Sequence, residues 1–307
     1  MTNKRRRGQY FTLGNPFDHP AFFSWAHRAD IRNERILEPF AGANSLVDHL
    51  ERMSLGRSYA SFDIEPFERR VRFRDTLESF PEGYSVCVTN PPWLAKNSAA
   101  ARGMRFPSCG HDDLFRHALS KCLAHCRHIA ALVSESFICA GLSTDRLADF
   151  ISLTSRLFQD TGHPVGLALF DPEPTNDIRV WSGRECIGNL SLLNRLRPEP
   201  RRGGPPVRFN DSNGNVGLFA LDNAAGPSIR FCEVGELDGY AVKPSGRHVT
   251  NIRVDEKVDI EAWNNRLGKF REETQDVLPT CYKGVRGDGK YRRRLDWSIA
   301  RGIIHRG

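Results

Sequence analysis

The stretch RILEPFAGANSLVDHLERM, residues 35–53, decides the fold class. Its apolar start predicts a strand at residues 35–39, a tight turn follows around Gly42, and the next residues predict a helix from 44 to 53. Strand and helix patterns continue to alternate as far as Leu193. This alternation is typical of an α/β fold in which helices cover both faces of a mostly parallel sheet.

Seven strands are predicted for this sheet. They lie at residues 35–39, 61–64, 71–75, 84–89, 129–133, 164–170 and 178–181, the last two as an antiparallel edge, and further helices lie at 112–126 and 144–158. Segment 197–206 is too rich in Pro and Gly for a helix or a central strand, which predicts a linker between domains at 1–196 and 207–307. Beyond it, the sequence predicts strands at 216–221 and 229–234 and a helix at 260–277.

The composition favours a polyanionic partner. The 307 residues carry a formal net charge of +7 and a sequence pI of about 9.1. Basic residues gather at 4–7, at 197–202 and in the tail after 282, and although one such cluster is often a solvated face, three of them favour binding. No apolar run approaches the length of a membrane span, and the N-terminus lacks the apolar core of a signal peptide, so we expect a cytoplasmic protein.

Polar groups stand at the ends of four predicted strands, where open α/β sheets bind their ligands. Glu38 precedes the turn at Gly42, and an acidic group there suits a cationic, nucleoside-like ligand better than a phosphate. Asp63 can accept both hydroxyls of a ribose, and Asp75 can accept an adenine amino group or act as a helix cap. Together these residues predict a site for S-adenosylmethionine.

The fourth strand ends in VTNPPW, residues 88–93. Proline fixes φ and cannot donate to a sheet, so Pro91 and Pro92 hold the chain in a stiff, exposed turn. Such a turn presents Asn90 and Trp93 to a flat polar ligand; the simpler alternative is a surface turn with a packed tryptophan.

The motif order resembles that of DNA adenine-N6 methyltransferases of the gamma class. Residues 8–12 resemble their N-terminal cofactor motif, 37–46 their glycine-loop motif and 90–93 their catalytic Asn-Pro-Pro-aromatic motif. Family members often carry a second glycine where this chain has Asn44, and Tyr or Phe where it has Trp93. The resemblance implies a Rossmann-like domain and cofactor contacts from Tyr10, Phe11, Thr12, Glu38, Phe40, Ala41, Gly42, Asp63, Ile64, Asp75 and Asn90.

The resemblance also implies a mechanism without a metal. The Asn90 side-chain oxygen and the Pro91 carbonyl would accept the two N6 hydrogens of adenine, with Pro92 stiffening the turn. The base must leave the duplex, and stacking on Trp93 would offset much of that cost. The second stacking residue is expected to be Phe158, for which a place in the core is the alternative.

The region after residue 206 is expected to recognise double-stranded DNA. Phosphate contacts are predicted from Arg201, Arg202, Lys290, Arg292, Arg293 and Arg294. The resemblance further implies a bacterial or phage protein that acts alone or beside a cognate restriction endonuclease.

Three alternatives remain open. The same motif occurs in enzymes that methylate RNA bases or a glutamine amide, although glutamine methyltransferases tend to carry their extra domain before the catalytic one. A non-catalytic nucleic-acid-binding protein on a decayed methyltransferase fold is the third. Separately, the residues Cys109, His111, Cys122, Cys126 and His128 raise the question of zinc, but without a Cys-x2-Cys pair we expect buried thiols and no metal.

Overall fold

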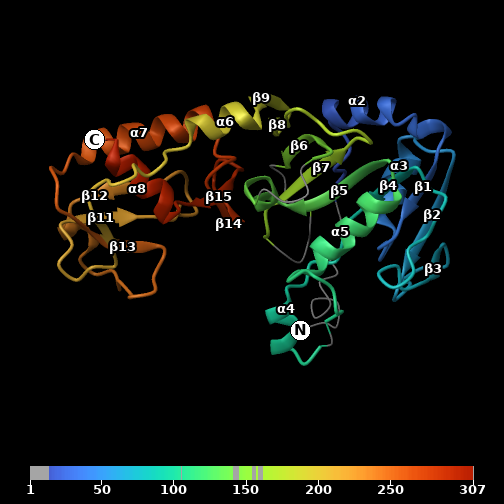
Figure 1. The fold of residues 1–307 in the computed structure, drawn as a ribbon, viewed down its shortest axis with the longest axis horizontal. Coiled ribbons are helices and arrows are strands. Elements are labelled where there is room, and N and C mark those ends of the chain that lie inside the picture. The colour runs from blue at the N-terminus through green and yellow to red at the C-terminus, as the bar shows by residue number, and fades with distance from the viewer. Residues whose placement is uncertain (1–13, 105, 141–144, 154–156, 158–161, 307) are drawn as a thin grey trace. The chain divides into compact units, whose positions relative to one another are not determined.

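The computed structural model describes residues 14–104, 106–140, 145–153, 157 and 162–306 (Figure 1). The chain divides into two compact units, residues 1–186 and 187–307, so the division falls before the predicted linker at 197–206. Among the described residues, no helix combines the length and the apolar character needed to cross a membrane.

The first unit is built on one large sheet, whose last strand continues to Asn189, past the boundary at residue 186. Its strands are β1 (Arg35–Glu38), β2 (Ser58–Asp63), β3 (Val71–Phe73), β4 (Val86–Thr89), β5 (His128–Ser134), β6 (Leu147–Leu153), β7 (Val165–Phe170), β8 (Arg179–Ser182) and β9 (Glu185–Asn189), and its helices are α2 (Pro20–Arg28), η1 (Ile31–Asn33), α3 (Ser45–Arg52), α4 (Lys96–Ala101), α5 (Leu114–His125) and η2 (Glu135–Cys139). The strand order is β3-β2-β1-β4-β5-β7-β6-β8-β9. The α/β class with a mostly parallel sheet is therefore confirmed, but the sheet has nine strands and not seven.

The parallel pairing runs without interruption from β3 through β2, β1 and β4 to β5. Strand β7 is antiparallel to both of its neighbours, β5 and β6. The sequence placed residues 164–170 at an antiparallel edge, and this placement is wrong because β7 lies inside the sheet. All six of its residues are buried.

The predicted helix at 144–158 is also wrong, because residues 147–153 form strand β6. Six of its seven residues are buried. A run buried on both faces shows no alternation, so hydrophobicity does not separate a central strand from a buried helix. Pairing with β7 and β8 decides the outcome, and Gly166 of β7 supports it, since a Cβ there would lie 2.5 Å from the Phe150 ring.

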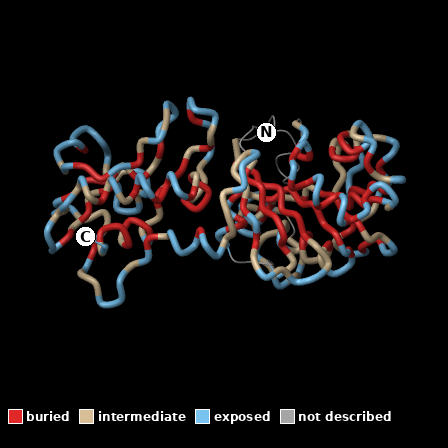
Figure 2. Tube along the Cα trace, turned by 90° about the horizontal axis from the view of Figure 1, so that it is seen from above, coloured by how far each residue is buried: buried red, intermediate tan, exposed pale blue. Residues whose placement is uncertain are grey.

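Helices pack on both faces of the sheet. Apolar residues of α2 and α3, among them Phe22, Trp25 and Leu50, share one buried cluster with Val86 and Val88 of β4. Cys87, between those valines, faces the other side, where Cys122 of α5 lies beside it. Figure 2 shows the resulting buried strands as a continuous band within this unit.

The second unit has an antiparallel sheet in the order β10-β13-β11-β12 and a separate hairpin. Its elements are α6 (Leu190–Leu196), β10 (Val207–Phe209), β11 (Val216–Phe219), β12 (Arg230–Cys232), η3 (Val234–Leu237), β13 (Val249–Val254), α7 (Ile260–Glu273), β14 (Thr280–Val285), β15 (Tyr291–Arg294) and α8 (Trp297–His305). Trp263 of α7 packs edge-to-face on Phe231 of β12, with ring centroids 5.5 Å apart.

The segment 197–206 packs against α8 instead of spanning open space. A Cβ added at Gly302 would lie 2.3 Å from the Pro198 carbonyl oxygen, so a glycine is required at this approach. His305 accepts a hydrogen bond from the Arg201 backbone N–H and also bonds the Pro205 carbonyl. The segment is therefore part of the second unit.

Candidate functional site

Glu38 lies at the carboxyl end of β1, beside the glycine turn. It is 1% exposed, and its Oε1 accepts hydrogen bonds from Thr89 Oγ1 at 2.8 Å and from the Phe40 N–H at 3.1 Å. No described residue donates a hydrogen bond to its buried Oε2. Burial raises the pKa of Glu38 to about 8, although the bonds from Thr89 and Phe40 act in the opposite direction. The site thus holds a buried acid whose second oxygen suits a cationic ligand.

The glycine turn depends on two left-handed residues, Gly42 at φ 50° and Asn44 at φ 62°. Asparagine adopts this region more readily than other side chains, which explains why the chain accepts Asn44 where a second glycine is usual. Asn44 is 1% exposed; its Nδ2 donates to Glu68 Oε1 at 3.0 Å, and no described residue contacts its buried Oδ1 through a hydrogen bond. The turn therefore presents a second buried acceptor.

Asp63 joins the end of β2 to this turn. Its Oδ2 accepts the Gly42 N–H at 2.8 Å, and its Oδ1 accepts the Glu65 N–H at 2.8 Å. Burial is the main cause that raises the pKa of Asp63, and these backbone bonds oppose it. Ile64, the next residue, keeps 52% of its surface exposed and so offers an apolar side chain beside the turn.

Asp75 has a local structural task. Its Oδ1 accepts the N–H groups of Leu77 at 3.0 Å and Glu78 at 3.3 Å, which is the geometry of a cap on a short turn. Thr76 donates to the Pro39 carbonyl at 2.8 Å and ties this turn to the end of β1. The contacts of Asp75 Oδ1 are therefore those of a capping residue, which was the alternative to binding adenine.

The segment from Asn90 to Trp93 follows β4 directly. Pro91 is buried, whereas Asn90, Pro92 and Trp93 are partly buried. Trp93 packs against the apolar cluster beneath α2 and α3, so part of its ring has a structural role. The Thr89 bond to Glu38 brings the start of this segment to the buried acid.

The structure brings Glu38, Gly42, Asp63 and Asn90 together at adjacent strand ends, because β2, β1 and β4 are neighbours in the sheet. Phe40 and Ala41 belong to the same turn, where the Ala41 N–H donates to the Phe62 carbonyl. Tyr10, Phe11, Thr12 and Phe158 lie outside the described residues. The sequence analysis did not identify Thr89. Its hydroxyl at the last position of the strand, directly before Asn90, would have indicated a polar contact at the site.

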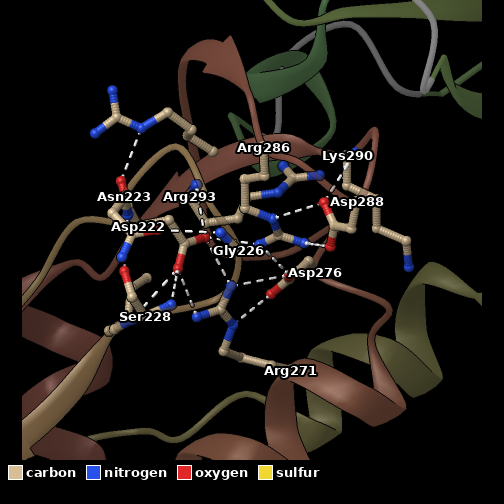
Figure 3. A network of polar contacts seen from close by, with 12 residues as sticks. Asp222, Asn223, Gly226, Ser228, Arg271, Asp276, Arg286, Asp288, Lys290 and Arg293 are labelled. Atoms are coloured by element: carbon tan, nitrogen blue, oxygen red, sulfur yellow. Dashed lines mark hydrogen bonds and ion pairs between the residues drawn. The ribbon is translucent and has the colours of Figure 1, made fainter.

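The basic residues predicted to bind DNA fall into different environments. Arg201 and Arg202 are exposed, while Lys290, Arg292 and Arg294 are partly buried. Arg293 is 3% exposed and contacts Cys281, and its backbone N–H donates to Asp222 Oδ2 at 3.1 Å (Figure 3). A side chain buried in this way does not reach phosphates, so Arg293 must be removed from the predicted DNA contacts.

Three buried thiols, Cys87, Cys122 and Cys126, meet between β4 and α5. Burial raises the pKa of Cys87 well above its usual range, and the neighbouring thiols Cys122 and Cys126 add to the effect. Within the part of the chain that the structure describes, no group of three or more His, Cys, Asp or Glu residues has the arrangement of a metal site. Buried thiols behave as small apolar side chains, and these three pack in that way.

No protein-family model matches this chain, and no curated protein matches it. Solved structures with a similar fold include a candidate class I S-adenosylmethionine-dependent methyltransferase from Listeria monocytogenes, at 13% identity and a TM-score of 0.39, covering 56% of this chain and 68% of that one.

Two further similar structures come from restriction-modification systems. One is a type I methyltransferase subunit from Streptococcus thermophilus, at 15% identity and a TM-score of 0.39, covering 56% of this chain and 47% of that one. The other is the M protein of the type I restriction enzyme EcoKI, at 13% identity and a TM-score of 0.38, covering 83% of this chain and 71% of that one. This chain thus spans under half of the Streptococcus subunit. Similarities at this level assign no function to it.

Proposed function

We propose that this protein is an S-adenosylmethionine-dependent methyltransferase that modifies the N6 amino group of adenine in DNA. The observation that carries the proposal is the 2.8 Å hydrogen bond from Thr89 to Glu38. The bond joins the buried acid of the glycine turn to the residue that precedes Asn90. The residues proposed to bind the cofactor and those proposed to bind the adenine therefore lie at two neighbouring strand ends.

The residues of the turn fit this cofactor. The buried Oε2 of Glu38 suits a cationic group such as an ammonium, and a cation there would relieve the unfavourable burial of the carboxylate. Asp63 accepts the Gly42 N–H and the exposed Ile64 follows it, so a ribose and a flat base would find a polar and an apolar contact beside the turn. S-adenosylmethionine, when bound, supplies a methyl group that its sulfonium has already activated.

The remaining chemistry belongs to the segment after β4. The adenine N6 lone pair is delocalised into the ring, so the amino group needs acceptors for its hydrogens as the lone pair turns toward the methyl. We assign these acceptors to the Asn90 side-chain oxygen and the Pro91 carbonyl, which two prolines hold in a fixed place. The exposed part of Trp93 would stack on the extruded base, a contact worth roughly 1–3 kcal/mol.

Double-stranded DNA is the proposed substrate, with Arg201 and Arg202 as exposed phosphate contacts. A cognate restriction endonuclease is a proposed partner. The family that the sequence resembles includes methyltransferases that act beside such an endonuclease and others that act alone.

The test uses the purified chain with labelled S-adenosylmethionine and, in parallel, duplex DNA, single-stranded DNA and RNA, with the product nucleosides identified by mass spectrometry. We expect N6-methyladenine in DNA. Asn90→Ala should abolish most of it while leaving cofactor affinity intact, and Asn97→Ala, an exposed asparagine of α4, is the matched control. Label in RNA alone, or in a protein, would contradict the proposal.

A further inference from the structure

The hairpin β14–β15 in the second unit has two different faces. Arg293 pairs with Cys281 across the hairpin, and both side chains turn to the same face, where Arg293 is buried. Because side chains alternate along a strand, Arg292 and Arg294 lie on the opposite face. Tyr282 of β14 is on that face as well, since the Arg292 guanidinium stands 5.3 Å from its ring centroid.

A fourth residue, His248, completes this face. Its ring meets the Tyr282 ring edge-on, with centroids 5.2 Å apart, and it is exposed. Partial desolvation of the ring lowers the pKa of His248, and the nearby charges of Arg294 and Arg292 lower it further, in keeping with two cations near the imidazole. We call Tyr282, His248, Arg292 and Arg294 the hairpin face.

The acidic residues around the hairpin are occupied by other arginines. Asp222 is fully buried and binds Arg271 at 2.8 Å and Arg286 at 2.7 Å (Figure 3). Asp276 bonds the same two arginines, and Asp288 pairs with Arg286 at 2.9 Å. The inner charges of this unit therefore compensate one another.

The hairpin face carries two cations, and only one of them pairs with a carboxylate. Arg292 donates its Nε–H to the Asp222 carbonyl. Within the described residues it forms no ion pair with a carboxylate, so its two terminal nitrogens can donate to a ligand. Arg294 has one ion pair, with Asp296 at 3.6 Å. The face thus combines two guanidinium groups with an aromatic ring, held on a hairpin that a buried ionic network fixes.

We propose that the hairpin face binds DNA, with Arg292 and Arg294 on backbone phosphates and Tyr282 stacked on a base or sugar. The assignment deepens the proposed function and rests on it, because the DNA would be the methylation substrate. Flat aromatic surfaces beside guanidinium groups match the π-face of a nucleotide and its phosphate together. A free phosphate or an acidic peptide would bind the arginines without using the Tyr282 ring, so the ring favours a nucleic acid.

The experiment measures binding of the full chain to a fluorophore-labelled duplex oligonucleotide across a series of salt concentrations. Each phosphate contact contributes about 0.9 to the slope of log affinity against log salt, so Arg292→Gln/Arg294→Gln should flatten that slope by about 2. Tyr282→Ala should weaken binding roughly 5- to 150-fold, as loss of one stacking contact does. The control Arg208→Gln/Arg230→Gln removes two exposed arginines of the same unit that lie on β10 and β12, outside the hairpin face, and should leave the slope close to that of the wild type.

Urea unfolding followed by Trp fluorescence is measured on every variant, because an unchanged free energy of unfolding shows that the second unit, which holds Trp263 and Trp297, still folds. A wild-type slope in Arg292→Gln/Arg294→Gln would overturn the inference, and so would tighter binding of RNA than of DNA. Methylation of DNA by the wild type would then still support the proposed function. Conversely, loss of DNA binding in the hairpin variants supports the inference even when the wild type transfers no methyl group.

Discussion

The Thr89 hydroxyl donates a hydrogen bond of 2.8 Å to Glu38, and this bond links the ends of two neighbouring parallel strands. Because Thr89 is fully buried and Glu38 almost so, water does not compete for the interaction. The protonation of Glu38 is therefore coupled to the segment that begins at Asn90, and pH becomes a probe of the site.

Stability should fall with pH because of Glu38. Its ordinary pKa is 4.5, and burial raises the value in the folded chain to about 8. The group's contribution is complete below 4.5 and is lost as pH rises toward 8, at up to about 1.4 kcal/mol per pH unit. Urea unfolding below, within and above this window should show the loss in the wild type and a flatter dependence in Glu38→Gln. Parallel curves for the two proteins would contradict the shift.

Binding of S-adenosylmethionine should release a proton near neutral pH. A cationic group beside Glu38 favours the carboxylate, so binding lowers the raised pKa of this residue. Calorimetric titrations in buffers of different ionisation enthalpy measure the number of protons released. We expect a fraction approaching one proton for the wild type and none for Glu38→Gln; equal release by both would place the cation elsewhere.

Asn44→Ala should destabilise the first unit by about 1–2 kcal/mol, because alanine in a left-handed conformation is strained. Asn44→Gly is the matched variant, since it relieves the strain and loses the same bond to Glu68. Chemical unfolding of the two variants separates backbone strain from the side-chain contact. If glycine is no more stable than alanine, the conformation of Asn44 is not the reason for its presence.

Gly166→Ala should cost about 1–3 kcal/mol through overpacking, because its Cβ would meet the Phe150 ring at 2.5 Å. A smaller partner should restore part of the loss, so Phe150→Leu is combined with Gly166→Ala in a double-mutant cycle. The two changes should couple favourably in thermal unfolding. Simple additivity would mean that the strands move apart instead.

Asp222→Asn should destabilise the second unit by roughly 3–5 kcal/mol. The change leaves Arg271 and Arg286 buried with one carboxylate fewer. Asp255→Asn is the control, because Asp255 is exposed and its pair with Arg253 should contribute less than about 1 kcal/mol. Urea unfolding followed by Trp fluorescence compares the two; a small effect at Asp222 would show that the network relaxes.

The sequence predicted the parallel half of the sheet well, since each of these short apolar strands ends in a turn residue or a polar group such as Asp63 or Asn90. It failed at β6, because Asp149 is buried among apolar neighbours and offers no solvent-facing pattern. Asp149 is held by Arg179 at 2.8 Å and by Trp181 at 3.0 Å, two partners more than 25 residues away in the chain. Such long-range contacts leave no local signature.

The candidate site was predictable at the strand ends and not beyond them. Glu38 and Asp63 stand where their strands stop, but the bonds that Thr89 and Gly42 make to them follow from register between strands. Arg293 shows the opposite failure. Three consecutive arginines look alike in sequence, and the alternation of a hairpin buries the middle one.

The packing of Pro198 on Gly302 sets where the protein can be cut. A fragment that begins at residue 187 keeps the 197–206 segment on α8, whereas one that begins at 207 strips it from the helix and removes the hydrogen-bond partners of His305. The proline-rich stretch that looks like a tether in the sequence is thus the cover of the last helix, and a fragment meant to keep the fold of the second unit must include it.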